Sequence, residues 1–129
     1  MSTHQPIRIL LVDDESSVLF ALRLLLEAMQ YSVTDFSSAD KALEALQKGE
    51  FDLCLCDLKM PNINGFEALK RAKEISPELA FILMSAHASS ADIDYARTHG
   101  AQGFIAKPFT PVQLRTVIDG ALSKLQHAV

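Results

Sequence analysis

Residues 7–15 read IRILLVDDE, an apolar run followed at once by three carboxylates. Its unbroken apolar part, ILLV at 9–12, is typical of a strand that is buried on both faces of a parallel sheet. Four further apolar, β-branched or aromatic runs follow at intervals of roughly 20 to 25 residues. They are YSVTDF (31–36), FDLCLC (51–56), AFILM (80–84) and QGFIA (102–106). We therefore expect five strands.

The segments between these runs have the spacing of amphipathic helices. The first is marked by an i, i+3, i+4, i+7 pattern of Val18, Leu19, Leu22, Leu25, Leu26 and Met29. Further helices are predicted over Ala39–Lys48, Gly65–Ile75, Ala91–His99 and Pro111–Leu125. Three of these begin with residues that can form capping pairs: Asn64 with Glu67, Ser89 with Asp92, and Thr110 with Gln113.

The alternation of strands and helices predicts right-handed βαβ crossovers. It indicates a doubly wound α/β fold with a five-stranded parallel sheet and helices on both faces. Only the run at 31–36 alternates polar and apolar residues, which places it at an edge of the sheet. The 129 residues contain no linker rich in Pro, Gly or Ser, so we expect one domain over residues 1–129, with a core from about 7 to 125.

The composition is that of an ordinary folded chain, with 49% hydrophobic and 22% charged residues. The net charge of −4 argues against direct nucleic acid binding, because there is no basic surplus to neutralise phosphates. No apolar run is long enough to span a bilayer, and residues 1–6 lack the pattern of a signal peptide. We therefore expect a cytoplasmic chain with no membrane part. Cys54 and Cys56, at i, i+2 on one strand face, are interpreted as buried thiols.

Chemistry-bearing side chains follow four of the five apolar runs. They are Asp13-Asp14-Glu15 after the first, Asp57 after the third, Ser85 after the fourth and Lys107-Pro108 after the fifth. Ligands of such sheets bind beyond the carboxyl ends of the strands, where these groups would meet. Clustered carboxylates repel one another, so the cluster predicts a cation, and oxygen ligands suit Mg²⁺. The added lysine and hydroxyl can balance the charge of a phosphoryl group, so the sequence predicts phosphoryl transfer to a carboxylate.

Each of these residues alone has a plainer interpretation. Asp13-Asp14-Glu15 could complement the dipole of the helix that follows, and Lys107 could be an ordinary surface lysine. A functional site is favoured because groups suited to phosphate or metal follow four separate strands at the same end of the sheet.

The whole constellation resembles the receiver domain of two-component response regulators, the family that includes the single-domain chemotaxis receivers. The resemblance extends from Ile7 to about Leu125. The motifs that carry it are LLVDDE (10–15), DLKMPNINGFE (57–67), LMSAH (83–87) and FIAKPF (104–109). It implies a flavodoxin-like sheet with strand order 2-1-3-4-5 and five helices.

The resemblance also implies a phosphoacceptor and a metal site. Asp57 would accept the phosphoryl group of a sensor histidine kinase or a histidine phosphotransfer domain. Asp57 and Asp14 would contact Mg²⁺ directly, and Asp13 would do so mainly through water. Lys59 would contribute only its backbone carbonyl. The chain would thus catalyse its own phosphorylation and slow autodephosphorylation without being a conventional metabolic enzyme.

The same resemblance assigns the residues that sense the phosphoryl group. Ser85 would donate a hydrogen bond to one phosphoryl oxygen and Lys107 would pair with another, with a cis Lys107-Pro108 bond. Phe104 stands at the aromatic switch position, although plain core packing is its other interpretation. Phosphorylation would alter the face made by the fourth helix, fifth strand and fifth helix, where a homodimer or an effector would bind.

Lys59 and His87 stand two residues beyond Asp57 and Ser85, at the positions where the family tunes hydrolysis of its acyl phosphate. Both are larger and more basic than the groups that usually help to position water there, so we expect slow hydrolysis.

Three other functions fit parts of the pattern. A Mg²⁺-dependent phosphatase with an aspartyl nucleophile would need a DxD motif after the first strand and a cap, and neither is present. In a flavodoxin-like electron carrier, Asp13-Asp14-Glu15 would repel the flavin phosphate, and no Trp is available to flank the ring. A degenerate receiver that acts only in docking would not be expected to keep all the pocket groups. The sequence leaves open the pathway, the cognate kinase and whether an output module follows Val129.

Overall fold

The computed structural model describes residues 5–126, with side chains described for residues 5–124. Every expected strand and helix is present, and their ends differ from the expected ones by at most two residues. The strands are β1 (Arg8–Val12), β2 (Ser32–Phe36), β3 (Leu53–Asp57), β4 (Ala80–Ser85) and β5 (Gly103–Ala106). The helices are α1 (Ser16–Ala28), α2 (Ala39–Lys48), α3 (Gly65–Ile75), α4 (Ser90–Thr98) and α5 (Pro111–Gln126). The expected core boundary at Leu125 lies outside the residues whose side chains are described.

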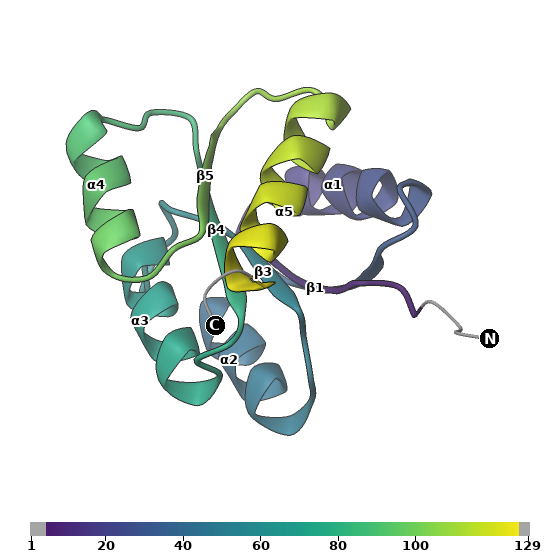
Figure 1. Cartoon of the computed structure of the whole chain (residues 1–129), viewed down its shortest axis with the longest axis horizontal. Coiled ribbons are helices and arrows are strands. Elements are labelled where there is room, and N and C mark those ends of the chain that lie inside the picture. The colour runs from purple at the N-terminus through teal and green to yellow at the C-terminus, as the bar shows by residue number, and fades with distance from the viewer. Residues whose placement is uncertain (1–4, 127–129) are drawn as a thin grey trace.

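The strands form one parallel sheet in the order β2-β1-β3-β4-β5, as predicted. Figure 1 labels β1, β3, β4 and β5 of this sheet. The run at 31–36 corresponds to β2 and lies at an edge. Its alternating pattern reflects one solvated face, whereas β3 and β4 are buried along their whole length. Among the described residues, no helix combines the length and the hydropathy needed to cross a membrane.

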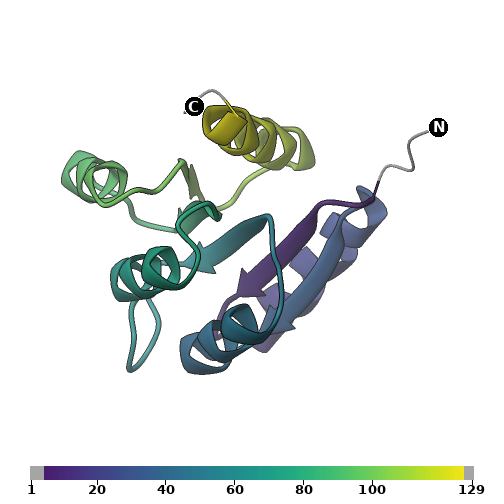
Figure 2. The ribbon, with the colours of Figure 1, turned by 60° about the horizontal axis from the view of Figure 1, so that its bottom comes forward.

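Helices cover both faces of the sheet (Figure 2). The sheet divides the core into two clusters. One cluster, with Leu22 and Ile118, lies under α1 and α5. The other, with Leu69 and the two cysteines, lies under α2, α3 and α4. Successive residues of β3 point to opposite clusters, so Cys54 and Cys56 share a face as expected. Both are buried free thiols whose pKa values are raised by burial.

The expected capping pairs form, with one difference. Ser89 with Asp92 and Thr110 with Gln113 each exchange two hydrogen bonds, side chain to backbone in both directions. The Asn64 side chain accepts from the Glu67 backbone N–H at 3.0 Å, but the Glu67 carboxylate pairs with Arg71 instead of returning the bond. The cap at the start of α3 is therefore one-sided.

Gly65 lets α3 begin directly against the end of β3. A Cβ at this position would lie 2.6 Å from a methyl carbon of Leu83, 2.7 Å from the Cα of Leu58 and 2.8 Å from the Asp57 carbonyl oxygen. The Gly65 N–H also donates to the Leu58 carbonyl at 2.7 Å. This close approach fixes the turn that follows Asp57.

Candidate functional site

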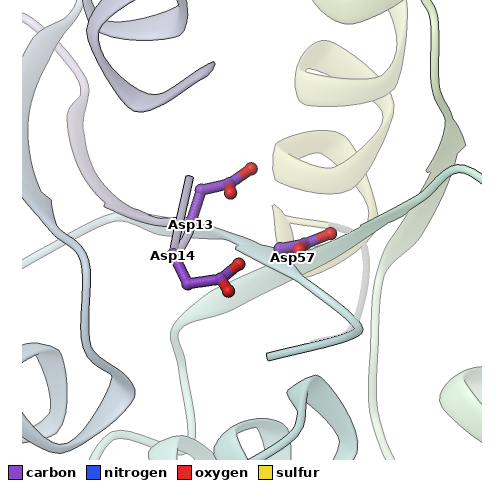
Figure 3. A group of neighbouring side chains, drawn as sticks. All are labelled: Asp13, Asp14 and Asp57. Carbon is purple, nitrogen blue, oxygen red and sulfur yellow. The ribbon is translucent and has the colours of Figure 1, made fainter. Parts of the chain in front are cut away.

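Three aspartates meet at the carboxyl end of the sheet. Asp13 and Asp14 follow β1, and Asp57 ends β3; Figure 3 shows their carboxylates side by side. One oxygen from each lies within 4.8 Å of the others. Asp13 and Asp57 are buried, whereas Asp14 is exposed. Glu15, which the sequence grouped with them, is exposed and lies outside this cluster.

Lys107, just beyond β5, reaches across the sheet to this cluster. Its Nζ lies 2.9 Å from an oxygen of Asp13 and 3.3 Å from an oxygen of Asp57. The second oxygen of Asp13 accepts the backbone N–H of Glu15 at 3.0 Å. Asp13 is thus held on both sides, which satisfies a carboxylate that has no solvent exposure.

The electrostatics of the pocket favour an added cation. Burial raises the pKa of Asp57, and the charges of Asp13 and Asp14 raise it further, while Lys107 partly offsets both effects. Burial alone would lower the pKa of Lys107, but its bonds to Asp13 and Asp57 outweigh this and raise it. Among the described residues, Lys107 is the one cation in an ion pair with this cluster, and it contacts only two of its three carboxylates. The cluster of carboxylate oxygens fits a hard divalent cation such as Mg²⁺.

Ser85 lies at the same end of the sheet but its hydroxyl is already engaged. It donates to the His87 carbonyl at 3.1 Å and accepts the His87 N–H at 3.2 Å.

Asp57 and Ser85 are the last residues of their strands, whereas the sequence analysis placed them just after the strands. Strand pairing continues through both residues, because Asp57 pairs with Met84 of β4 and Ser85 pairs with Ala106 of β5.

The remaining predicted residues lie on β5 and on the loops that follow β3, β4 and β5. Lys59 and His87 are exposed, on the loops that follow β3 and β4. Phe104, on β5, is half-buried against the α2–α3–α4 side of the core. It lines a hollow of about 380 Å³ between α4 and α5. The peptide bond between Lys107 and Pro108 is cis.

Two features of the site were not predicted from the sequence. One is the choice of Asp13 as the nearer partner of Lys107, and the other is the occupied hydroxyl of Ser85. Neither leaves a signal in the residue pattern, because both depend on side-chain rotamers. Within residues 5–126, Asp13, Asp14 and Asp57 are the only group of three His, Cys, Asp or Glu side chains arranged to hold a metal ion.

Comparisons with known proteins give a consistent assignment. The family model of the response regulator receiver domain matches residues 9–119. The chain is 37% identical over 113 residues to the two-component response regulator ARR14 of Arabidopsis thaliana, covering 86% of this chain and 30% of that protein. It is 40% identical over 108 residues to the alginate biosynthesis transcriptional regulatory protein AlgB of Pseudomonas aeruginosa, covering 84% and 24%. The chain thus spans less than a third of the length of these relatives.

Solved structures agree with this assignment. A CheY-like receiver domain protein from Methanospirillum hungatei superposes with a TM-score of 0.87 at 30% identity, covering 94% of this chain and 97% of that one. The beryllofluoride-activated NtrC4 receiver domain dimer gives a TM-score of 0.85 at 28% identity, covering 92% and 98%. These likenesses favour the receiver interpretation over the phosphatase and the electron carrier. The chain belongs to the response regulator receiver domain family.

Proposed function

We propose that this chain is a phosphoacceptor in a cytoplasmic phosphorelay, and that Asp57 takes the phosphoryl group from a phosphohistidine of a sensor kinase or a phosphotransfer protein. The observation that carries this proposal is the position of Asp57. Its carboxylate ends a buried strand, lies in a cluster with Asp13 and Asp14, and accepts a hydrogen bond from Lys107. Its side chain keeps 11% of its surface exposed, so a donor can reach it.

Asp14, Asp57, the Lys59 backbone carbonyl and, through water, Asp13 would hold Mg²⁺. The bound ion would offset negative charge on the cluster and on the phosphoryl oxygens. The donor set supports this, since it offers oxygen ligands with an excess of negative charge.

The transfer itself needs an in-line approach of donor and acceptor. A carboxylate oxygen of Asp57 forms a bond to phosphorus while the bond from phosphorus to the donor imidazole nitrogen breaks. The electron pair remains on the imidazole, which then takes a proton from solvent. Lys107 stays protonated throughout and pairs with one phosphoryl oxygen. Its raised pKa supports this role.

Ser85 and Phe104 would convert phosphorylation into a change of surface. Ser85 would turn from His87 to donate to a phosphoryl oxygen, and Phe104 would move into the space behind it. The altered face is made by α4, β5 and α5, where a homodimer or an effector would bind. The NtrC4 receiver, which is similar to this chain, forms a beryllofluoride-activated dimer, and this supports a readout of this kind.

Phosphorylation by a phosphorylated histidine phosphotransfer domain with Mg²⁺ tests the acceptor. Mass spectrometry of the wild-type chain should find one acyl phosphate, on Asp57. Asp57→Asn should abolish it, and Asp40→Asn, an exposed carboxylate on α2, should leave it unchanged. Undiminished labelling of Asp57→Asn would overturn the assignment.

A further inference from the structure

Helix α4 has few attachments to the rest of the molecule. Ala96 is its only buried residue. Its N-terminus is closed by the reciprocal bonds of Ser89 and Asp92, which are internal to the helix and its cap. Contacts of individual side chains therefore decide where α4 lies.

The main side-chain contact on one flank is aromatic. The Tyr95 ring meets Phe66 of α3 edge-on, with ring centroids 4.6 Å apart and an interplanar angle of 62°. His99 stacks on the same tyrosine at 4.0 Å, and Lys70 Nζ lies 5.6 Å from its ring centroid. Edge-on geometry is favourable for aromatic pairs. The Phe66–Tyr95 contact thus ties α4 to α3, its neighbour in Figure 1.

The opposite flank of α4 leaves room to move. The hollow of about 380 Å³ lies between Ile93, Ala96 and Arg97 of α4 and the facing side of α5, with Phe104 beside it. A shift of α4 toward α5 would fill this space. The same shift would carry Tyr95 away from Phe66.

The start of α4 is also connected to the phosphorylation site. The Ser85 hydroxyl can donate only one hydrogen bond, and it donates this to the His87 carbonyl. To donate to a phosphoryl oxygen it must release that carbonyl, and a rotation of the Ser85 side chain that moves the Oγ atom would also take the acceptor from the His87 N–H. Residues 86–89 would then rearrange, and α4 begins at Ser90. The movement of Ser85 is therefore coupled to the position of α4.

We propose that the Phe66–Tyr95 contact holds α4 in its unphosphorylated position and so opposes the switch. The inference rests on the proposed function of Asp57. A contact made in only one of two conformations shifts the equilibrium toward that conformation. By linkage, removing the contact must tighten the binding of any ligand that favours the other conformation.

Beryllofluoride, a phosphoryl analogue, is the probe. Its affinity with Mg²⁺ can be measured by following amide chemical shifts during a titration. Tyr95→Leu and Phe66→Leu should each bind it roughly 2- to 10-fold more tightly than the wild type, the range that an aromatic pair of ordinary strength supplies. Tyr95→Phe keeps the ring and should match the wild type. Phe20→Leu removes an exposed ring from α1 and should also match it.

The double variant Tyr95→Leu/Phe66→Leu completes a double-mutant cycle with the two single variants. It should bind no more tightly than the better single variant, because both changes remove the same contact. Thermal melts establish that each variant is folded, and either single variant suffices if the other does not fold. Wild-type binding that Asp57→Ala abolishes supports the proposed function, and no wild-type binding at all would overturn it. Normal wild-type binding with equal or weaker binding by the folded leucine variants would overturn the role of the Phe66–Tyr95 contact alone.

Discussion

Lys107 Nζ lies 2.9 Å from an oxygen of Asp13, although 94 positions separate the two residues in the chain. Asp13 has no solvent exposure, and Lys107 retains 19% of its side-chain surface. The ammonium also reaches Asp57 at 3.3 Å. Lys107 is therefore the internal counter-ion of the carboxylate cluster, in addition to its proposed part in phosphoryl transfer.

Removal of this counter-ion should destabilise the metal-free protein. Lys107→Ala leaves the Asp13 carboxylate buried without its cationic partner, which costs about 3 kcal/mol of unfolding free energy. Added Mg²⁺ should recover part of the loss. Denaturant unfolding with and without Mg²⁺ measures both effects. Lys41→Ala, on the exposed surface of α2, is the matched control and should change little. Equal stability of the two variants would contradict the counter-ion role.

Removal of the acceptor charge should have the opposite effect on the metal-free fold. The pKa of Asp57 is raised in the folded state by burial and by Asp13 and Asp14, so its ionised form is disfavoured there. Asp57→Asn should therefore raise the melting temperature near neutral pH, by roughly 2 to 5 °C for about 1 kcal/mol. Added Mg²⁺ should raise the melting temperature of the wild type more than that of Asp57→Asn.

The pH dependence follows from the same shift. The folded wild type holds the Asp57 proton to higher pH than the unfolded chain does, so the contribution of Asp57 to stability falls as pH rises from the ordinary carboxyl pKa through the raised one. Asp57→Asn lacks this loss of stability. The difference in stability between Asp57→Asn and the wild type should therefore grow across the window between the two pKa values and stay constant at higher pH. An advantage that is equal on both sides of the window, or a variant less stable at neutral pH, would argue against a strained carboxylate.

Two glycines should respond oppositely to alanine. Gly65→Ala brings a methyl group against the backbone of Asp57 and Leu58, which should cost roughly 1 to 3 kcal/mol and displace the acceptor. Gly120→Ala in α5 meets nothing within 4 Å and should stabilise by about 0.5 to 1 kcal/mol through helix propensity. Thermal melts measure both changes, and phosphorylation rates should drop only for Gly65→Ala. A well-tolerated Gly65→Ala would show that the turn after β3 can relax.

Loss of the phosphoryl group should be slow, and two exposed side chains should account for it. The Lys59 ammonium can pair with a phosphoryl oxygen in the ground state, and the His87 ring can cover the approach of water. Stabilising the ground state without an equal gain in the transition state slows hydrolysis. Lys59→Asn and His87→Ala should each speed decay by about 10-fold, which corresponds to about 1.4 kcal/mol. Phosphate release from the phosphorylated chain gives the rates, and unchanged decay in both variants would remove these residues from the mechanism.

The sequence predicted the sheet more completely than it predicted the contacts around the site. The edge position of β2 could be predicted because solvent on one face leaves an alternating pattern. The convergence of Asp57 and Lys107 could be predicted because carboxyl ends of parallel strands meet. The assignment of Asp57 and Ser85 to positions beyond their strands was wrong, because strand ends depend on pairing with a neighbour. The Phe66–Tyr95 contact depends on how two helices are rotated, which local periodicity does not specify.

The division of the core by the sheet also bears on how this chain tolerates change. Leu22 of α1 and Leu69 of α3 belong to separate clusters on opposite faces of the sheet. Distant substitutions without shared partners usually have additive effects, within about 0.3 to 0.5 kcal/mol. Truncating both leucines should thus cost the sum of the two single losses. Core residues of the helices on one face of the sheet can consequently be substituted without compensating substitutions on the other face. The two core clusters can therefore change in sequence independently of each other.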